Sequence, residues 1–357
     1  MKNISDKKIR VLIVDDSAFY RQTLSTMLSS MPNIEIVGTA RDGADAIMMV
    51  SKHHPDVITL DLEMPKVDGF VFLRWLLKNS PIPVVVVSSQ SDQANVFKAL
   101  ELGAVDFIAK PTQQASLQIL EIREELISKI TAISCVPIER LLSRVSLQKE
   151  SVNRPAYPVR REAKKIEDIQ LVAIGASTGG PTAVQAIVAQ LPEDFPVPMI
   201  VSQHMPPGFT QYFAERLNKL SRVTVLEARH GDLLGQGHVY ICPGGYHMAL
   251  LKVKEGVRIQ LNLKQDADRY VPSVDQMFLS ANDIYPGCVL GVILTGMGND
   301  GKMGMRKIKE GGGQTIAESE ETAVVFGMPK EAITEGVVDK VLPLPQICQE
   351  IVRRVLS

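Results

Sequence analysis

The hydrophobic pattern divides the chain into two long stretches in which short apolar runs alternate with segments of helical spacing. In residues 8–134 the expected strands are 9–14, 35–40, 57–60, 84–87 and 105–109, and the expected helices are 18–30, 43–52, 70–78, 93–102 and 114–134. Largely apolar runs of this length are typical of strands that are buried on both faces. We therefore expect five βα units around a doubly wound parallel sheet.

Residues 169–357 repeat this alternation with a more varied middle part. Apolar strands are expected at 171–174, 197–203 and 288–294, helices at 182–191, 208–219, 273–281, 302–310 and 344–356, and short outer strands at 315–317 and 338–341. Between residues 223 and 263 glycine is more frequent, and polar and apolar residues alternate, notably over 238–241 and 248–254. We predict a second doubly wound α/β domain with an inserted antiparallel hairpin.

The stretch between the two patterns, residues 135–168, has weak periodicity. Residues 136–166 hold eight basic residues, three acidic residues and three prolines, although helical spacing continues over 138–147. This composition favours a solvated, semi-flexible linker over a basic site for an acidic partner. The length of 357 residues also fits two domains, so we place them at 8–134 and 169–357.

Composition argues against several classes of protein. The 39 basic and 40 acidic residues leave a net charge of −1, which does not indicate a nucleic-acid partner. No apolar run approaches the roughly 20 residues of a membrane span, and residues 1–10 are too polar for a signal peptide. The four cysteines lack CxxC spacing, which favours reduced thiols in a cytoplasmic protein.

Polar side chains gather at the ends of the strands predicted for residues 8–134. These side chains are Asp15, Asp16, Asp61, Ser88 and Lys110. In a parallel sheet they share one edge, where ligands bind. Carboxylates on one edge repel each other unless a cation joins them, and Mg²⁺ prefers oxygen ligands. A lysine and a hydroxyl beside them suit a phosphoryl group, although the pair at 15–16 alone would equally predict a helix cap.

Over about residues 8–134 these features resemble a response-regulator receiver domain. The resemblance implies that Asp61 is the phosphorylated aspartate and that a histidine kinase is the phosphodonor. It also implies Mg²⁺ bound by Asp15, Asp16 and Asp61, with the backbone carbonyl of Glu63 as a further ligand.

Two further receiver roles follow from the same resemblance. Ser88 resembles the switch hydroxyl, and Lys110 resembles the phosphate-binding lysine. Lys110 and Pro111 match a Lys-Pro pair that is usually cis in this family.

The chemistry of the second domain centres on residues 171–181. Ser177 follows an apolar strand and precedes Gly179, Gly180 and Pro181. Pro181 suits the first turn of a helix, so Ser177 is expected at a helix N-terminus, where backbone N–H groups favour negative charge. The pattern allows a capped turn, a dinucleotide-binding glycine loop or the nucleophile elbow of a serine hydrolase.

The next strand ends favour the hydrolase. Residues 197–203 lead to His204, where a dinucleotide site would place an acidic residue, and 288–294 lead to a loop that contains Asp300. A hydroxyl, an imidazole and a carboxylate are the groups of a catalytic triad. The order Ser-His-Asp differs from the Ser-Asp-His order of α/β-hydrolases, which argues against that fold. His247 is the main competing base, and residues 299–301 would also fit a turn and helix cap.

Three motifs are similar to the catalytic motifs of chemotaxis protein-glutamate methylesterases, CheB. They lie at 175–181, 203–206 and 294–301, and weaker similarities occur at 228–232, 237–241, 272–275 and 325–330. The resemblance implies that Ser177 is the nucleophile, His204 the base and Asp300 its orienting group. It also implies an oxyanion donor at the Met297 backbone N–H, with Thr178 beside the nucleophile, and no cofactor in the esterase site.

One position departs from the family pattern. Many members carry arginine directly before Pro-Ser-Val-Asp, whereas this chain has Val271. Any substrate contact that this arginine makes is therefore not carried over to this chain.

The resemblance further implies hydrolysis of glutamate methyl esters on methyl-accepting chemotaxis receptors, with release of methanol, and deamidation of some receptor glutamines. A tethered receiver at an effective concentration of about millimolar could shield Ser177 until Asp61 is phosphorylated. The alternative is a response regulator whose second domain only binds a partner. The sequence does not identify the receptors or the modified glutamates.

Overall fold

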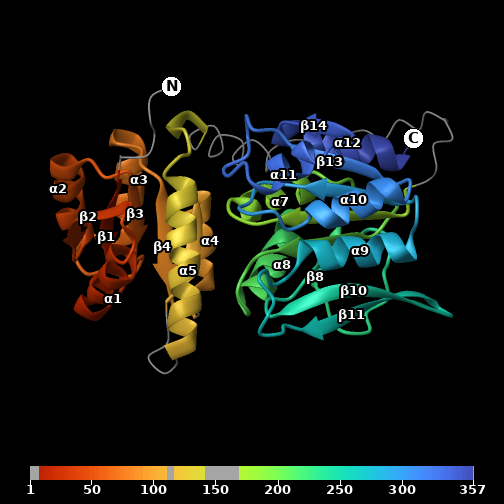
Figure 1. Ribbon diagram of the computed structural model, residues 1–357, viewed down its shortest axis with the longest axis horizontal. Coiled ribbons are helices and arrows are strands. Elements are labelled where there is room, and N and C mark those ends of the chain that lie inside the picture. The colour runs from red at the N-terminus through yellow and green to blue at the C-terminus, as the bar shows by residue number, and fades with distance from the viewer. Residues whose placement is uncertain (1–7, 90, 111–115, 141–168, 357) are drawn as a thin grey trace. The chain divides into compact units, whose positions relative to one another are not determined.

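A computed structural model of the chain describes residues 8–89, 91–110, 116–140 and 169–356, with only the backbone described for 116–121. The chain divides into two compact units, residues 1–145 and 146–357 (Figure 1). Most of the predicted linker, from residue 141 onward, lies outside the described residues, as does most of the predicted helix 138–147. Pro111 and its peptide bond also lie outside them.

The first unit is the predicted doubly wound parallel sheet. Its strands are β1 (Ile9–Val14), β2 (Ile34–Ala40), β3 (Val57–Leu60), β4 (Val84–Ser88) and β5 (Asp106–Ala109). They pair in the order β2-β1-β3-β4-β5, all in parallel. The apolar side chains of β1 from Val11 onward and those of β3 and β4 are almost fully buried, as both faces of the sheet are covered.

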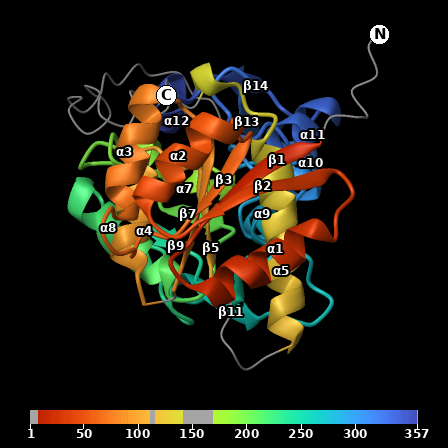
Figure 2. The same ribbon diagram turned by 90° about the vertical axis from the view of Figure 1, so that its left-hand side faces the viewer.

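Five helices cover the two faces of this sheet. They are α1 (Ala18–Ser29), α2 (Gly43–His53), α3 (Gly69–Asn79), α4 (Gln93–Glu101) and α5 (Ser116–Ile133). Figure 2 shows α1 and α5 on one face and α2, α3 and α4 on the other. This winding leaves the carboxyl ends of β1, β3, β4 and β5 open at one edge.

The second unit is built on a larger parallel sheet. Its strands are β6 (Leu171–Ala176), β7 (Met199–Gln203), β8 (Thr224–Glu227), β9 (His238–Ile241), β12 (Val289–Ile293), β13 (Gln314–Glu318) and β14 (Lys340–Leu342). They pair in the order β14-β13-β12-β6-β7-β9-β8. The strands β6, β7 and β12 lie side by side at the centre and are buried along their whole length. Two doubly wound parallel domains are thus confirmed.

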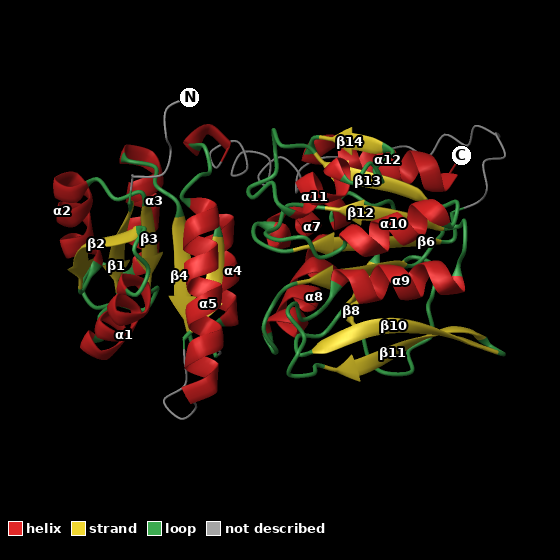
Figure 3. Ribbon diagram, in the orientation of Figure 1, coloured by secondary structure: helices red, strands yellow, loops and turns green. Residues whose placement is uncertain are grey.

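Helices cover both faces of the second sheet as well. They are α7 (Gly180–Val188), α8 (Phe209–Leu220), α9 (Val274–Ile284), α10 (Lys302–Glu310), α11 (Met328–Thr334) and α12 (Leu344–Leu356). The helices α9 and α10 pack together on one face, and α7 packs against α8 and α12 on the other (Figure 3). Among the described residues, no helix has the length and apolarity that would let it cross a membrane.

The antiparallel hairpin is present, but one of its expected strands was wrong. The hairpin pairs β10 (Tyr246–Val253) with β11 (Gly256–Leu263) and packs against α9 (Figure 3). The segment at 238–241, which we grouped with the hairpin, is instead β9, a parallel strand of the main sheet. Its last three residues are buried, as both faces of the main sheet are covered, whereas β10 and β11 each keep an exposed face.

Candidate active site and phosphorylation site

Ser177, His204 and Asp300 lie together at the carboxyl edge of the second sheet, and we call these three residues the triad. Ser177 follows β6, His204 follows the neighbouring strand β7, and Asp300 lies between β12 and α10. The Nδ1 atom of His204 is 3.1 Å from Ser177 Oγ, and its Nε2 atom is 2.8 Å from Asp300 Oδ2. The backbone N–H of His204 also donates to the carbonyl of Ala176 at 3.1 Å. A hydrogen bond of the sheet edge therefore sets the spacing of serine and histidine.

The imidazole of His204 presents its nitrogen atoms in a defined order. Asp300 is ionised at neutral pH, so it can only accept, and the ring proton must lie on Nε2. The lone pair on Nδ1 then faces the hydroxyl of Ser177. In the well-known serine proteases Nε2 faces the serine instead. The roles of the two nitrogen atoms are exchanged here, while the chemistry that they permit is the same.

Four donors besides His204 surround the buried carboxylate of Asp300. They are the backbone N–H groups of Val274 (2.7 Å), Asp275 (2.9 Å) and Gly301 (3.1 Å) and the hydroxyl of Ser273 (3.2 Å). Burial alone would raise the pKa of Asp300, but His204 and these N–H groups together lower it. Val274 and Asp275 begin α9, so the carboxylate does cap a helix, but this helix is α9 and not the one that follows it in sequence.

The backbone around Ser177 is held from both sides. The side-chain amide Nε2 of Gln203 donates to the backbone carbonyls of Ser177 (2.9 Å) and His204 (3.0 Å). The backbone N–H of Gly180 donates to the carbonyl of Ser177 at 2.7 Å. On the other side, Ser177 N–H donates to the carbonyl of Thr295 at 3.0 Å. The side chain of Gln203, for which the sequence indicated no role, therefore links the backbone of the candidate nucleophile to that of the candidate base.

Tyr270 is a second neighbour that sequence reasoning missed. Its ring stacks on the imidazole of His204, with 5.2 Å between the ring centres and 10° between the planes. The guanidinium of the exposed Arg269 lies 5.2 Å from the centre of the Tyr270 ring. Val271, where many family members have arginine, is partly buried. No periodic pattern marks Tyr270, because it lies in a connection between two elements.

Thr178 directly follows Ser177, and Met297 lies in the loop that packs on it. Thr178 is 1% exposed, and its hydroxyl has no hydrogen-bond partner among the described residues. Met297 follows Gly296, and a methyl group added to Gly296 would lie 2.8 Å from Ser177 Cβ. The loop 294–301 therefore packs directly on the serine. The buried Glu318, also missed from sequence, accepts from Thr295 N–H at 2.9 Å and fixes the start of this loop.

The other histidines of the second unit do not reach the triad hydroxyl. His230 Nδ1 accepts from the backbone N–H of Leu261 at 3.3 Å, and His238 contacts the carbonyl of Gln236 at 2.8 Å. His247, the competing base, is buried, and both of its ring nitrogens are hydrogen-bonded to other groups. Of these candidates, His204 alone lies within hydrogen-bonding distance of Ser177 Oγ.

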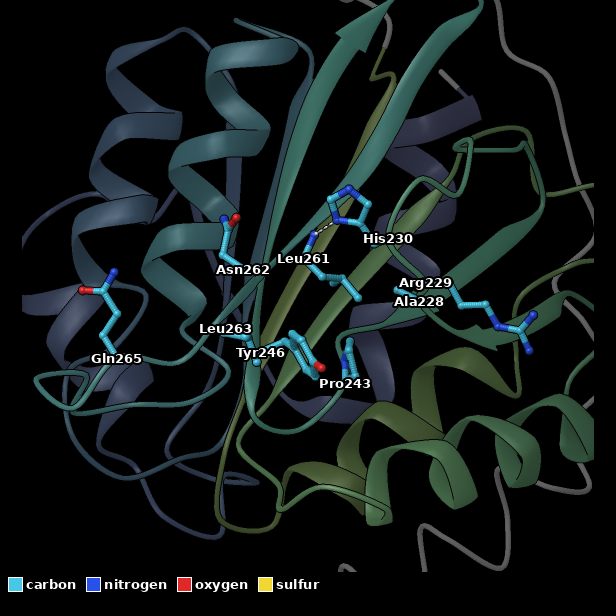
Figure 4. A pocket seen from close by; sticks show the side chains of 9 residues that line it. All are labelled: Ala228, Arg229, His230, Pro243, Tyr246, Leu261, Asn262, Leu263 and Gln265. Atoms are coloured by element: carbon cyan, nitrogen blue, oxygen red, sulfur yellow. Dashed lines mark hydrogen bonds between the residues drawn. The ribbon is translucent and has the colours of Figure 1, made fainter.

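An open pocket of about 830 Å³ lies beside the hairpin (Figure 4). It is lined by Ala228, Arg229, His230, Pro243, Tyr246, Leu261, Asn262, Leu263 and Gln265. No triad residue lines it. Gly244 lies in the turn between two of the lining residues, Pro243 and Tyr246. It packs so closely against Pro206 that a Cβ atom at this position would clash. The pocket therefore adjoins the segment that follows His204.

The polar residues predicted for the first unit also gather at one edge. Lys110 Nζ lies 2.7 Å from Asp61 Oδ2 and 3.0 Å from Asp15 Oδ2. Carboxylate oxygens of Asp15, Asp16 and Asp61 lie within 4.8 Å of one another. Asp16 is exposed, whereas Asp15 and Asp61 are buried, so the cluster opens to solvent on one side. A hard divalent cation fits this set of oxygen donors.

Burial and Lys110 set the charge state of this cluster. Burial raises the pKa of Asp61 to about 6, and Lys110 opposes this rise. Burial also raises the pKa of Asp15, against the same lysine. Two carboxylates share one ammonium group, so an added cation would relieve the remaining repulsion.

The remaining receiver residues lie at or beside this edge. Ser88 ends β4 and donates its hydroxyl to Asp92 Oδ2 at 2.9 Å. The backbone N–H of Glu63 is 3.4 Å from Asp61 Oδ1, which places the Glu63 main chain beside the candidate phosphorylation site. Lys110 Nζ also lies 4.6 Å from the centre of the Tyr20 ring.

Comparisons with known proteins cover nearly the whole chain. A family model described as "CheB methylesterase" matches residues 172–351, and one described as "Response regulator receiver domain" matches residues 11–120. A Geobacter sulfurreducens protein named protein-glutamate methylesterase/protein-glutamine glutaminase 3 is 48% identical over 362 residues, which cover 98% of each chain. A Pyrococcus abyssi protein with the same two activities in its name is 42% identical over 99% of this chain and 95% of its own.

A solved structure agrees with the family match for the second unit. The crystal structure of the Thermotoga maritima CheB methylesterase catalytic domain is 44% identical and has a TM-score of 0.51. It covers 53% of this chain and 99% of that domain. The chain therefore belongs to the CheB methylesterase family and combines a response-regulator receiver domain with a methylesterase domain.

Proposed function

We propose that this protein is a phosphorylation-regulated protein-glutamate methylesterase and protein-glutamine glutaminase. Ser177 is the nucleophile, His204 the general base and Asp300 the group that orients the imidazole. The observation that carries this proposal is the continuous hydrogen-bonded path from Ser177 Oγ through His204 to Asp300, with separations of 3.1 and 2.8 Å. The names of the relatives contain both activities.

The first half of the reaction is acylation. His204 Nδ1 accepts the Ser177 proton as Oγ attacks the carbonyl carbon of a glutamyl methyl ester. The resulting imidazolium keeps its Nε2–H bond to the ionised Asp300. The tetrahedral intermediate then collapses: the bond from carbon to the methoxy oxygen breaks, His204 Nδ1–H protonates that oxygen, and methanol leaves.

The second half of the reaction is hydrolysis of the acyl-enzyme. Water attacks the acyl carbon, His204 Nδ1 takes the water proton, and the proton then returns to Ser177 as glutamate is released. In this proposal the oxyanion of both intermediates accepts a hydrogen bond from the Met297 N–H, and Thr178 is the residue next to the nucleophile. A glutamine side chain follows the same path with ammonia as the leaving group, and neither reaction requires a cofactor.

The substrates that we propose are methylated glutamates and certain glutamines of methyl-accepting chemotaxis receptors. Control comes from the receiver domain, in which a histidine kinase supplies the phosphoryl group to Asp61. Asp15, Asp16 and Asp61, with the Glu63 carbonyl, would hold Mg²⁺, which shields the phosphoryl charge. Lys110 would bind the phosphoryl oxygens and Ser88 would respond to them. The domain boundaries that suit this arrangement are 8–134 and 169–357, joined by a linker.

The proposed activity is tested with Ser177→Ala in the full chain. Methanol release from membranes that carry methylated receptors should fall at least about 10⁴-fold, because no other group replaces the lost nucleophile. The unfolding temperature should stay within a few degrees of the parent value. A matched control is Ser221→Ala, which removes a hydroxyl with no hydrogen-bond partner among the described residues and should leave the rate unchanged. Undiminished release by Ser177→Ala would remove Ser177 from the mechanism.

A further inference from the structure

We propose that His247 is a positioning residue for the triad. Its buried imidazole clamps the connection between β11 and α9, residues 264–273, and through it holds Tyr270 on His204 and Ser273 against Asp300. This inference rests on the proposed function, because it assumes that His204 and Asp300 act on Ser177. The ring nitrogens of His247 are hydrogen-bonded to Asp268 and Ser273, not to the candidate nucleophile or the candidate base.

Both ring nitrogens of His247 form hydrogen bonds with residues of this connection. The backbone N–H of Ser273 donates to Nδ1 at 3.0 Å, and Nε2 lies 2.8 Å from Asp268 Oδ2. A backbone N–H can only donate, so Nδ1 carries no proton and Nε2–H donates to the carboxylate. The ring is 2% exposed, and its hydrogen-bonding capacity is used in full. This arrangement explains why His247, despite its place near the triad, is not available as a base.

The far end of the clamped connection supports Asp300. Ser273 donates its hydroxyl to Asp300 Oδ1 at 3.2 Å, and it is also the N-cap of α9, whose first N–H groups hold the same carboxylate. The bond from Ser273 N–H to His247 therefore fixes the residue from which these donors start. If Ser273 shifts, the donors that orient Asp300 shift with it.

The middle of the connection places Tyr270 on His204. Tyr270 lies between Asp268 and Ser273, the two residues that His247 holds. The ring stack with His204 covers one face of the base. An imidazole that is covered on one face and bonded at Nε2 has little freedom to rotate away from the serine.

The connection needs such an anchor because it has little packing of its own. Within residues 264–271 every side chain is exposed or only partly buried. Its other contacts include the bond from Lys264 N–H to the Gly245 carbonyl, a turn in which Gln265 N–H donates to Asp268, and a long bond of 3.4 Å from the Tyr270 hydroxyl to Asn299 Oδ1. The Asp268 carboxylate that closes this turn is the same one that accepts from His247, and these two hydrogen bonds lower its pKa. The imidazole of His247 is thus the buried group that joins this turn to Ser273 at the start of α9.

The test measures kcat and KM for methanol release in full-length His247→Ala, with the parent and His238→Ala as comparisons. His238 is a histidine of the same unit whose contacts do not lead to the triad. For His247→Ala we expect kcat to fall about 10–100-fold with KM changed less than about threefold, since small misplacement of reacting groups is costly. His238→Ala should leave both constants close to the parent values. An unchanged kcat in His247→Ala would overturn the proposal.

Two further variants separate positioning from loss of folding. Asp268→Ala removes the partner of His247 on the partly exposed connection, so the core stays intact, and it should reproduce a kcat loss of about 3–30-fold. His247→Gln keeps an N–H donor near the Nε2 position and should recover part of the rate. If the kcat loss of His247→Ala equals its loss of folded protein, and Asp268→Ala has the parent kcat, His247 is only structural.

A double-mutant cycle with Tyr270→Ala checks the route of the effect. If His247 acts through the connection, the double variant should lose little more activity than the more damaged single variant, because both changes free His204. Independent losses that multiply would contradict this route. Ser177→Ala distinguishes the two levels of proposal: if it is inactive while His247→Ala is fully active, the proposed function stands and only the present inference fails.

Discussion

The carboxylates at the two sheet edges have different neighbours. In the receiver unit, Asp15 and Asp61 are buried and share the ammonium group of Lys110. In the methylesterase unit, Asp300 is surrounded by backbone N–H groups, a hydroxyl and one imidazole, and no lysine or arginine of the described residues forms an ion pair with it. Both groups lie near the carboxyl ends of parallel strands, yet the charge of the first is balanced by a lysine side chain and that of the second largely by backbone dipoles.

This difference fits two kinds of task. Burial raises the pKa of Asp15 and Asp61, and a carboxylate cluster of this kind is stabilised when a divalent cation binds to it. Such an edge responds to what binds there. The pKa of Asp300 is instead lowered by donors that are already in place, so its negative charge requires no reorganisation during the reaction.

Removal of divalent cations should produce the largest difference in activity between the two sheet edges. With a chelator present, we expect labelling of Asp61 by a small acyl phosphate donor to fall to background and to return when Mg²⁺ is added in excess. Methanol release by the unphosphorylated protein should not change, because no step at the triad uses a metal ion. Asp61→Asn is the control for labelling. Two results would contradict this difference between the two edges: labelling of Asp61 that persists in the chelator, or methanol release that falls in the chelator.

Asp300→Asn tests whether the carboxylate of Asp300 fixes the orientation and tautomer of His204. The amide can occupy the site of the carboxylate, but its NH₂ group can donate to His204 Nε2 and thereby place the ring proton on Nδ1, facing Ser177. We expect kcat to fall about 10⁴-fold, as in other triads with the wrong tautomer. Asp283→Asn, an exposed carboxylate on α9, should have the parent kcat. A loss below about tenfold would mean that Asp300 does not orient the base.

Gly296→Ala tests how closely the loop 294–301 is fitted to the serine. The added methyl group would lie 2.8 Å from Ser177 Cβ and would also overlap the sulfur of Met328. We expect a 10–100-fold lower kcat and a loss of about 1–3 kcal/mol in the free energy of unfolding. Gly38→Ala in the receiver, where the nearest atom would be 3.4 Å away, serves as the matched control for stability. Equal behaviour of the two variants would argue against a tight fit.

Sequence reasoning succeeded where the position of a residue follows from a single strand. Ser177 and His204 directly follow β6 and β7, and the ends of parallel strands share an edge, so their proximity followed once the strands were recognised. The receiver cluster was predictable for the same reason.

Prediction failed where contacts depend on the path of a connection. Tyr270 stacks on His204, and His247 bonds to Ser273, only because of the path of residues 264–273, and local patterning carries no signal for this path. The assignment of 238–241 failed for a related reason, because a four-residue run cannot show whether it joins a hairpin or a larger sheet. Ser273 could have been found, since a serine before an apolar helical pattern is a common N-cap.

The hydrogen bond from His204 N–H to the Ala176 carbonyl has a consequence for adaptability. It places Ser177 and His204 side by side at the ends of two paired strands of the central sheet. The connections around them can therefore change without altering this spacing. The hairpin, the turns and the segment that carries Tyr270 can change with the substrate, while the two central strands β6 and β7 keep the spacing of the reactive pair.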